Sequence, residues 1–212
     1  ADIPFNYPAL NNIAAREATG DLICLMNNDI EILSPDWIQE MGSFAIQPEV
    51  GCVGAKLWYP DGTLQHGGVV LGIGGIAGHA FKGFRKNDVG YVCRAIVHQS
   101  YSAVTAACLM IRKSVFDDVG GLDEAFVVAL NDVDFCLRVR AAGYRNVWTP
   151  YSEMNHHESA TRGYEDNPEK IARFERERNL LFSRWESLMF NDPAYSPNLT
   201  LDNEGFEIAR TS

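Results

Sequence analysis

The chain has 212 residues, of which 46% are hydrophobic and 22% charged, and its formal net charge at pH 7 is −10. This composition is typical of one globular domain and excludes a largely disordered chain. The acidic charge of the whole chain argues against non-specific binding to nucleic acid or to an anionic membrane.

The cysteine pattern and the hydropathy predict a cytoplasmic location. The cysteines are odd in number, and no two of them form a CxxC pair, so neither a disulfide framework nor a cysteine zinc site is expected. No apolar run reaches the ~18 residues of a membrane-spanning helix, and the first residues lack the pattern of a signal peptide. The five cysteines are Cys24, Cys52, Cys93, Cys108 and Cys136.

Helices and strands alternate along the first part of the chain. Apolar residues at helical spacing predict a helix over residues 10–19. The continuous apolar run of residues 22–26 predicts a strand that is buried on both faces. The Ser-Pro-Asp sequence of residues 34–36 is typical of a helix start with Ser34 as the cap. Residues 50–58 predict the next strand.

Six glycines fall between residues 67 and 78, and we expect a flexible, irregular excursion from there to about residue 90. Their spacing matches neither GxGxxG nor a P-loop. Asn131 is a candidate cap for a later helix. The other predicted elements are strands over 103–111 and 144–148, the latter ended by Pro150, and helices over 113–119, 132–142 and 168–190. This alternation predicts an α/β layered fold.

Asn27, Asn28 and Asp29 directly follow the strand predicted over residues 22–26. In open α/β sheets, ligands bind at the carboxyl ends of strands. The oxygen atoms of Asp29 suit Mg²⁺ or Mn²⁺ that is held together with substrate phosphates. The alternative is a simple turn, which these residue types also favour.

Two carboxylates, Asp132 and Asp134, begin the helix predicted over residues 132–142. A carboxylate at this position commonly does no more than complement the helix dipole. Arg138 lies four residues after Asp134, and this spacing predicts a surface ion pair. Asp132 has no basic residue at the same spacing, so we interpret Asp132 as a carboxylate that faces a cleft.

His156 and His157 follow the strand predicted over residues 144–148. Two adjacent imidazoles cannot easily face one metal, so we expect one to be a ligand or hydrogen-bond donor and the other to point outward. A solvated histidine pair is the alternative. The polar loop through Ser159 and Arg162 could close over phosphate groups, with the arginine as a forked hydrogen-bond donor. The alternative is a plain linker.

Five segments, taken together in this order, resemble the family 2 glycosyltransferases with the GT-A fold, of the rhamnosyltransferase or O-antigen type. The segments are residues 12–29, 34–41, 106–123, 131–143 and 155–163. The resemblance implies a mixed sheet with flanking helices. It assigns residues 1–190 to a partial GT-A domain and residues 191–212 to a C-terminal tail. We expect the last twenty or so residues to be loosely held. The family's opening nucleotide-binding strands have no counterpart, so we expect an N-terminally truncated domain of a longer chain.

The resemblance also implies roles for individual residues. Its acidic metal motif matches residues 27–29, with Asp29 as the charged ligand of Mn²⁺ or Mg²⁺ and Asn27 as a neutral ligand through its carbonyl oxygen. His156 is preferred to His157 as a further ligand, and Asp132 matches the general base of an inverting transfer. The residues implied to bind the donor are Asn12, Asn28, Ser159 and Arg162. Those implied beside the acceptor or behind the site are Asn131, Asp134 and His157.

The implied reaction moves a sugar from a UDP-, dTDP- or GDP-linked donor to a saccharide or lipid-linked acceptor in the synthesis of bacterial surface polysaccharide. A lipid-linked acceptor would allow peripheral contact of the protein with the inner membrane. No nucleic acid partner is expected. The alternative is a non-catalytic binding or scaffold module, because Asn27 and Asn131 stand where the family has acids. The retention of Asp29, Asp132 and a downstream histidine favours the enzyme. A nucleotidyltransferase would leave residues 131–143 unexplained.

Overall fold

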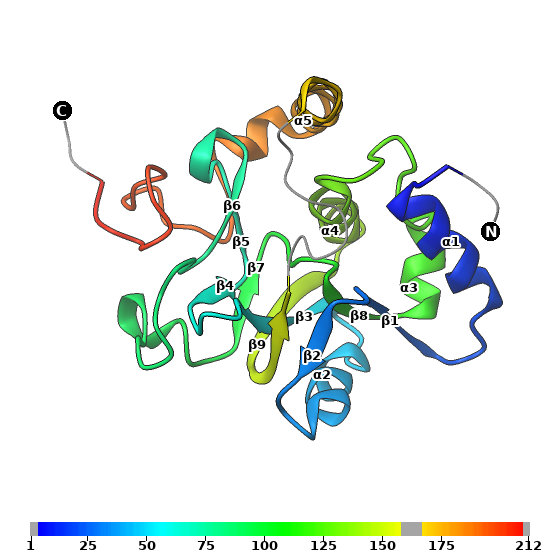
Figure 1. Ribbon diagram of the computed structural model, residues 1–212, viewed down its shortest axis with the longest axis horizontal. Helices are drawn as coiled ribbons and strands as arrows, with labels where there is room; N and C mark the ends of the chain where they lie inside the picture. Colours follow the sequence, from blue (N-terminus) through cyan, green and yellow to red (C-terminus); the bar gives the residue numbers. More distant parts are fainter. Residues whose placement is uncertain (1–3, 158–166, 210–212) are drawn as a thin grey trace.

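Two long strands, β3 and β9, run parallel to each other through the centre of the structure (Figure 1). The computed structural model describes residues 4–157 and 167–209. Five strands of the main sheet lie in the order β1-β8-β3-β9-β2, while β4 pairs with β3 and β7 with β9. All strand pairs of this sheet except the parallel β3–β9 pair are antiparallel, so the sheet is mixed. The strands are β1 (Leu22–Met26), β2 (Ile30–Ile32), β3 (Val50–Trp58), β4 (Leu64–His66), β7 (Gln99–Tyr101), β8 (Cys108–Arg112) and β9 (Arg145–His156).

Helices cover both faces of this sheet, as the α/β prediction requires (Figure 1). Met41 of α2 belongs to the apolar cluster on one face. Phe116 of α3, Phe135 of α4 and Leu181 of α5 belong to the cluster on the other. None of the helices in the described ranges combines the length and apolarity of a membrane-spanning segment. The helices are α1 (Tyr7–Glu17), α2 (Trp37–Ala45), α3 (Lys113–Asp118), α4 (Asn131–Ala141) and α5 (Pro168–Met189).

Two predictions for the first part of the chain are wrong. β1 lies at the edge of the described sheet, and its Cys24 is exposed, so the apolar run of residues 22–26 is not buried on both faces. Ser34 does not cap α2. Its hydroxyl instead accepts the backbone N–H of Glu153 in β9 at 3.0 Å. In both places the tertiary partner outweighs the local pattern.

β9 is longer than the strand predicted over residues 144–148, and it continues through Pro150 to His156. Its pairing with β3 loses regular register between Trp148 and Glu153, where β9 has extra residues. Proline is tolerated at such an irregularity because it has no N–H to donate to the ladder. The extension carries His156 to the candidate site.

The glycine-rich stretch forms a packed hairpin and not the flexible excursion that its composition predicts. β5 (Val69–Leu71) and β6 (Ala77–His79) pair antiparallel, and the side chains of β5 are buried. Gly68 has a φ of +104°, and a Cβ atom there would lie 2.1 Å from the ring of Tyr101. Glycine is therefore required at this position for the hairpin to approach β7.

Residues 192–206 belong to the tail that we expected to be loosely held, and they pack against this hairpin. Asp192 is buried, and its carboxylate accepts the N–H of Leu71 at 2.7 Å. The buried ring of Phe206 stacks on Phe81 with centroids 4.4 Å apart. The expectation of loose attachment is wrong for these residues, whereas the domain division at residue 190 stays a prediction.

The buried amide of Asn146 joins four parts of the fold. The parallel register of β3 and β9 shifts close to Cys52, and the N–H of Cys52 donates to Asn146 Oδ1 at 3.2 Å. Asn146 Nδ2 donates to the carbonyl oxygens of Ser102, after β7, and Cys136, in α4, at 2.9 and 3.0 Å. A side chain of β9 thereby replaces a missing backbone partner and links β3, α4 and the chain after β7.

Replacing Asn146 with alanine is expected to destabilise the protein strongly. The change leaves one N–H and two carbonyl groups buried without their present partners, and each such group costs about 1–3 kcal/mol. We expect the free energy of unfolding, measured by urea denaturation, to fall by about 3 kcal/mol or more. The matched control is Asn87→Ala at an exposed position, where the change should stay within about 0.5 kcal/mol. Equal losses in the two variants would contradict this role of Asn146.

Candidate active site

The turn between β1 and β2 brings Asn27 and Asp29 to the end of β9. The backbone N–H of Asn27 donates to Ala107 O at 2.9 Å, and that of His157 donates to Asp29 O at 3.0 Å. β2 pairs with the last residues of β9, so the side chain of His156 lies beside the turn. Two of the sequence-predicted segments, far apart in the chain, therefore meet here.

The side chains of Asn27, Asp29 and His156 form one cluster. His156 Nε2 lies 3.1 Å from Asp29 Oδ1 and 3.2 Å from Asn27 Nδ2. His156 Nδ1 donates to Gln65 Oε1 of β4 at 2.7 Å. The side chains of Asp29 and His156 are only 15% and 10% exposed. Gln65 thus orients the imidazole so that Nε2 points toward Asp29 and Asn27, and no local sequence pattern indicates this role of Gln65.

Asp132 lies close to this cluster through a shared stretch of backbone. The N–H of Ala106 donates to Asp132 Oδ2 at 3.1 Å, and the N–H of Val133 donates to Oδ1 at 2.9 Å. The next residue, Ala107, accepts the N–H of Asn27. These two alanines lie before β8, although the sequence predicts a strand there. The N–H of Ala106 therefore binds the candidate base Asp132, and the carbonyl of the next residue, Ala107, binds Asn27 of the candidate metal motif.

Two histidines that the sequence analysis did not assign to a site border the same backbone. His66 of β4 is fully buried, and its Nε2 accepts the N–H of Thr105 at 3.4 Å. Its Nδ1 lies 2.8 Å from His79 Nδ1 of β6. Burial first, and then the neighbouring His79 and His156, hold the pKa of His66 well below its usual value, so this imidazole is neutral. Only the folded hairpin brings His66 and His79 together.

The backbone before α4 is held in an unusual conformation by α5. Leu130 has a φ of +60°, which non-glycine residues rarely adopt. The buried carboxylate of Glu177 accepts the N–H groups of Val128 and Ala129 at 3.2 and 2.8 Å. Asn131 does not cap α4 as predicted, because it is the first helical residue and its Nδ2 donates to Val128 O at 2.7 Å. Its role beside the acceptor stays a prediction.

Asp134 forms the ion pair with Arg138 that its spacing predicts, but the pair is not at the surface. Its side chain is fully buried, and its carboxylate accepts hydrogen bonds from Arg138 Nε at 2.8 Å, Arg184 Nη1 at 3.1 Å and Trp185 Nε1 at 3.0 Å. The last two donors belong to α5. These contacts anchor α4 to α5, and the acceptor-side role expected of Asp134 stays a prediction.

The remaining predicted residues lie elsewhere. His157 points outward, with Nε2 3.2 Å from Glu31 Oε2, and the two side chains are 45% and 58% exposed. Asn28 is exposed in the turn between β1 and β2. Ser159 and Arg162 lie outside the described residues. The functional roles of these residues stay predictions.

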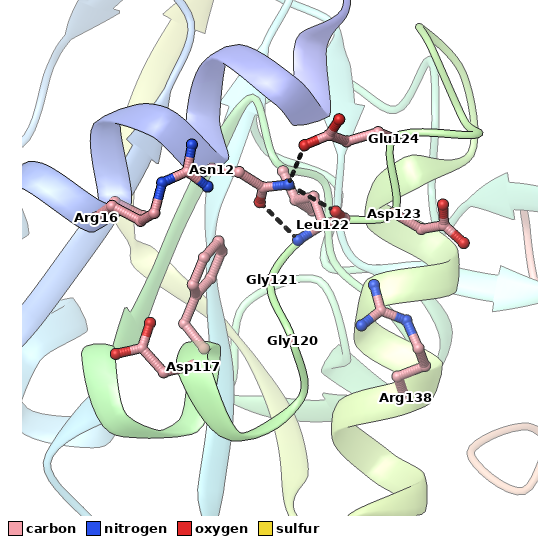
Figure 2. A pocket seen from close by; sticks show the side chains of 11 residues that line it. Asn12, Arg16, Asp117, Gly120, Gly121, Leu122, Asp123, Glu124 and Arg138 are labelled. Carbon is pink, nitrogen blue, oxygen red and sulfur yellow. Dashed lines mark hydrogen bonds between the residues drawn. The ribbon is translucent and has the colours of Figure 1, made fainter.

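Asn12 lies on α1 beside a separate pocket of about 540 Å³ (Figure 2). Its Nδ2 donates to Leu122 O at 2.8 Å and to Glu124 Oε1 at 3.2 Å, and its Oδ1 accepts the N–H of Leu122 at 2.9 Å. Figure 2 shows these bonds between α1 and the turn at Gly121. The metal and base candidates do not line this pocket. The donor-binding role of Asn12 therefore stays a prediction.

The cluster around His156 suits a divalent cation that also binds phosphate. It offers one carboxylate, one oriented imidazole nitrogen and one amide, which are all ligand types for Mn²⁺. Within residues 4–157 and 167–209, no group of three or more His, Cys, Asp and Glu side chains is placed to hold a metal. A cation held by Asp29 and His156 would therefore need further oxygen ligands, such as those of a bound diphosphate.

The chain matches no protein-family model. It is 55% identical over 207 residues to the uncharacterized protein y4gI of Sinorhizobium fredii, covering 97% of this chain and 23% of that protein. It is 42% identical over 206 residues to the O-antigen biosynthesis protein RfbC of Myxococcus xanthus, covering 94% of this chain and 16% of that protein. Over 60 residues, 28% of this chain and 20% of the other, it is 37% identical to an N-acetylglucosaminyl-diphospho-decaprenol L-rhamnosyltransferase of Mycobacterium tuberculosis. The chain spans less than a quarter of the length of these relatives.

Two solved structures are similar to most of this chain. GalNAc-T7 with UDP, GalNAc and Mn²⁺ superposes with a TM-score of 0.64 at 10% identity, covering 91% of this chain and 36% of that chain. The mannosyltransferase PcManGT of Pyrobaculum calidifontis, with GDP-Man and Mn²⁺, superposes with a TM-score of 0.50 at 16% identity, covering 87% and 49%. At this level of identity the likeness shows a common fold.

Glu177→Gln is expected to loosen the backbone before α4. Glutamine keeps one acceptor oxygen where glutamate has two, so either Val128 or Ala129 loses its acceptor. The free energy of unfolding should fall by about 1–3 kcal/mol, and the amide hydrogens of these two residues should exchange faster with solvent. The control Glu175→Gln, with a side chain 49% exposed on the same helix, should change neither quantity. Unaltered exchange at both amides would refute the role of Glu177.

Proposed function

We propose that this chain, which has the fold of the GT-A glycosyltransferases, is the sugar-transferring part of a larger enzyme of bacterial surface-polysaccharide synthesis. The identity with RfbC over 94% of the chain supports the link to O-antigen synthesis. The observation that carries the proposal is the meeting of Asp29 and His156 next to the backbone that holds Asp132.

We place a Mn²⁺ or Mg²⁺ ion between Asp29 and His156, with Oδ1 of Asn27 as a further ligand after a rotation of the amide, because Nδ2 faces His156 Nε2 in the structure. Two observations support this choice: Asp29 Oδ1 is buried and lies against Nε2, and Gln65 holds the hydrogen of the imidazole on the other nitrogen. When bound, the cation would offset the negative charge on the departing nucleoside diphosphate. A residue that orients a histidine ligand in this way commonly raises metal affinity.

Asp132 serves as the general base in this proposal. The acceptor hydroxyl loses its proton to the Asp132 carboxylate while its oxygen forms a bond to the anomeric carbon of the sugar. The bond between that carbon and the diphosphate oxygen breaks in the same step, and the configuration inverts. The two backbone N–H groups bound by Asp132 fix the carboxylate in place without occupying all of its lone pairs.

The proposed donor is a sugar linked to UDP, GDP or dTDP, and the proposed acceptor is a sugar on a lipid diphosphate. The first part draws on the two similar structures, which contain UDP and GDP-Man. The second draws on the name of the mycobacterial relative, which specifies a diphospho-decaprenol substrate. An enzyme with such an acceptor would work at the cytoplasmic face of the inner membrane.

Calorimetric titration of the chain with UDP, GDP and dTDP in the presence of Mn²⁺ tests the donor site. We expect one nucleotide to bind only with the metal, and Asp29→Ala to weaken its affinity tenfold or more, which is about 1.4 kcal/mol. The exposed His157–Glu31 pair provides the control, and His157→Gln should leave the affinity unchanged. Binding that Asp29→Ala does not alter would reject this metal site. Failure of all three nucleotides to bind would favour the non-catalytic module.

Asp132→Asn in the full-length protein tests the base. We expect kcat to fall by about a hundredfold to ten-thousandfold, because general-base catalysis contributes about that much, while donor affinity stays unchanged. Asp36→Asn, at the exposed start of α2, is the matched control and should keep full activity. Normal turnover by Asp132→Asn would disprove the role.

A further inference from the structure

Exposed apolar side chains gather in one segment of the described structure. Of its fourteen exposed large hydrophobic residues, five lie within residues 89–97, and Val92 is 75% exposed. A sixth, Tyr151, is adjacent, because its hydroxyl donates to Ile96 O at 3.4 Å. Isolated exposed apolar residues are normal, whereas a contiguous group marks an interaction site. The five residues are Val89, Tyr91, Val92, Ile96 and Val97.

The same part of the chain is basic, although the whole chain has a net charge of −10. Lys82, Arg85 and Lys86 are all exposed. Asp88 is the acidic residue among them, and its carboxylate accepts the backbone N–H of Arg85 at 2.8 Å. The local charge is thus opposite to that of the protein and complementary to an anionic surface. We call residues 82–97 the basic apolar loop.

The backbone of the basic apolar loop holds its apolar tip outward. Val92 and Cys93 have φ angles of +49° and +62°, which are strained for residues with a Cβ, above all for a β-branched valine. The loop is anchored to β3, because the buried Lys56 donates from Nζ to Ala95 O at 3.2 Å. Within the loop, the N–H of Ala95 donates to Val89 O at 3.0 Å. A strained conformation that keeps an apolar side chain in water points to an external contact.

The basic apolar loop is joined to the candidate active site through β4. Gly83 N–H donates to Leu64 O, and Leu64 N–H donates to Phe84 O, both at 2.7 Å. The next residue of β4, Gln65, is the one that binds His156. The other end leads into β7 and on to the backbone that holds Asp132. In Figure 1 the loop projects beside β4 and β7, at the opposite end of the molecule from α1 and α3.

We propose that the basic apolar loop, with Tyr151, is the surface by which this protein docks on an anionic lipid bilayer. Val92 and its apolar neighbours enter the boundary between headgroups and acyl chains, and Lys82, Arg85 and Lys86 contact lipid phosphates. A protein partner is disfavoured because lysine, present at two positions of the loop, is depleted in protein interfaces. The inference rests on the proposed function in one respect: docking here brings the head of a lipid-linked acceptor beside Asp132.

Flotation of the purified chain with vesicles tests the proposal. We expect binding to vesicles of phosphatidylethanolamine and phosphatidylglycerol, and little binding to phosphatidylcholine alone. Val92→Asn should reduce binding about fivefold or more while keeping the fold, because asparagine tolerates positive φ. The triple change Lys82→Gln, Arg85→Gln and Lys86→Gln should reduce it about tenfold or more and weaken its salt dependence.

Matched controls separate the loop from the rest of the surface. Ile208 is also 75% exposed but lies outside the loop, so Ile208→Asn should bind vesicles like the unaltered chain. Cys24 and Cys93 are the exposed cysteines of the described residues. An environment-sensitive fluorophore on Cys93, in a Cys24→Ser background, should shift its emission to the blue on anionic vesicles. The same fluorophore on Cys24, in a Cys93→Ser background, should not.

Several results would overturn the proposal. They are an absence of binding to anionic vesicles, equal losses in Val92→Asn and Ile208→Asn, an unshifted probe on Cys93, and a dimer in light scattering that Val92→Asn dissociates. The last result would assign the loop to a second copy of the chain. Vesicle binding needs neither nucleotide nor metal, so it is independent of the tests of transfer. If transfer exists, Val92→Asn should slow it about fivefold or more only with a lipid-linked acceptor in vesicles, and not with a soluble acceptor.

Discussion

The arrangement of the candidate site depends on the buried amide of Asn146. A shift in the pairing of β3 and β9 leaves the N–H of Cys52 without a strand partner, and the amide oxygen takes that place. The amide nitrogen binds Ser102 and Cys136, and so joins the central strands to α4 and to the chain that continues toward Ala106. Asp132 lies in the first turn of α4 and accepts the N–H of Ala106, so the contacts of Asn146 help to position the base candidate relative to the sheet.

The base candidate and the metal-ligand candidates are bound by the same short stretch of backbone, and different elements support each of them. Ala106 and Ala107 bind Asp132 and Asn27. α5 supports Asp132 from behind, through Glu177 on the strained loop and through the donors to Asp134. β4 supports the other half through Gln65, which orients His156. Helix α5 and strand β4 thus hold the polar groups of the site in place. The basic apolar loop is hydrogen-bonded to the same strand β4.

Much of the fold follows from local pattern. The helix of residues 132–142 and the strands around residues 22–26 and 50–58 lie where their periodicity predicts them. The closeness of Asp29 to His156 agrees with the roles that the family resemblance implies, although metal binding itself stays a prediction. The errors have one cause. Ser34 and Asn131 carry strong local signals for caps, yet each side chain has a different partner in the folded chain. Asp134 keeps its predicted partner Arg138, but the carboxylate is buried and also binds two donors of α5.

The type and order of most elements, the turn that carries Asp29, and the start of the helix that carries Asp132 follow from the amino-acid sequence. These features depend on residues within a few positions of one another. Three features depend on long-range packing: the glycine-rich stretch packs as a hairpin, Gln65 orients His156, and Glu177 holds the loop before α4. Each of these contacts joins residues far apart in the chain, and a buried polar group takes whichever partner the packed fold brings within hydrogen-bonding distance.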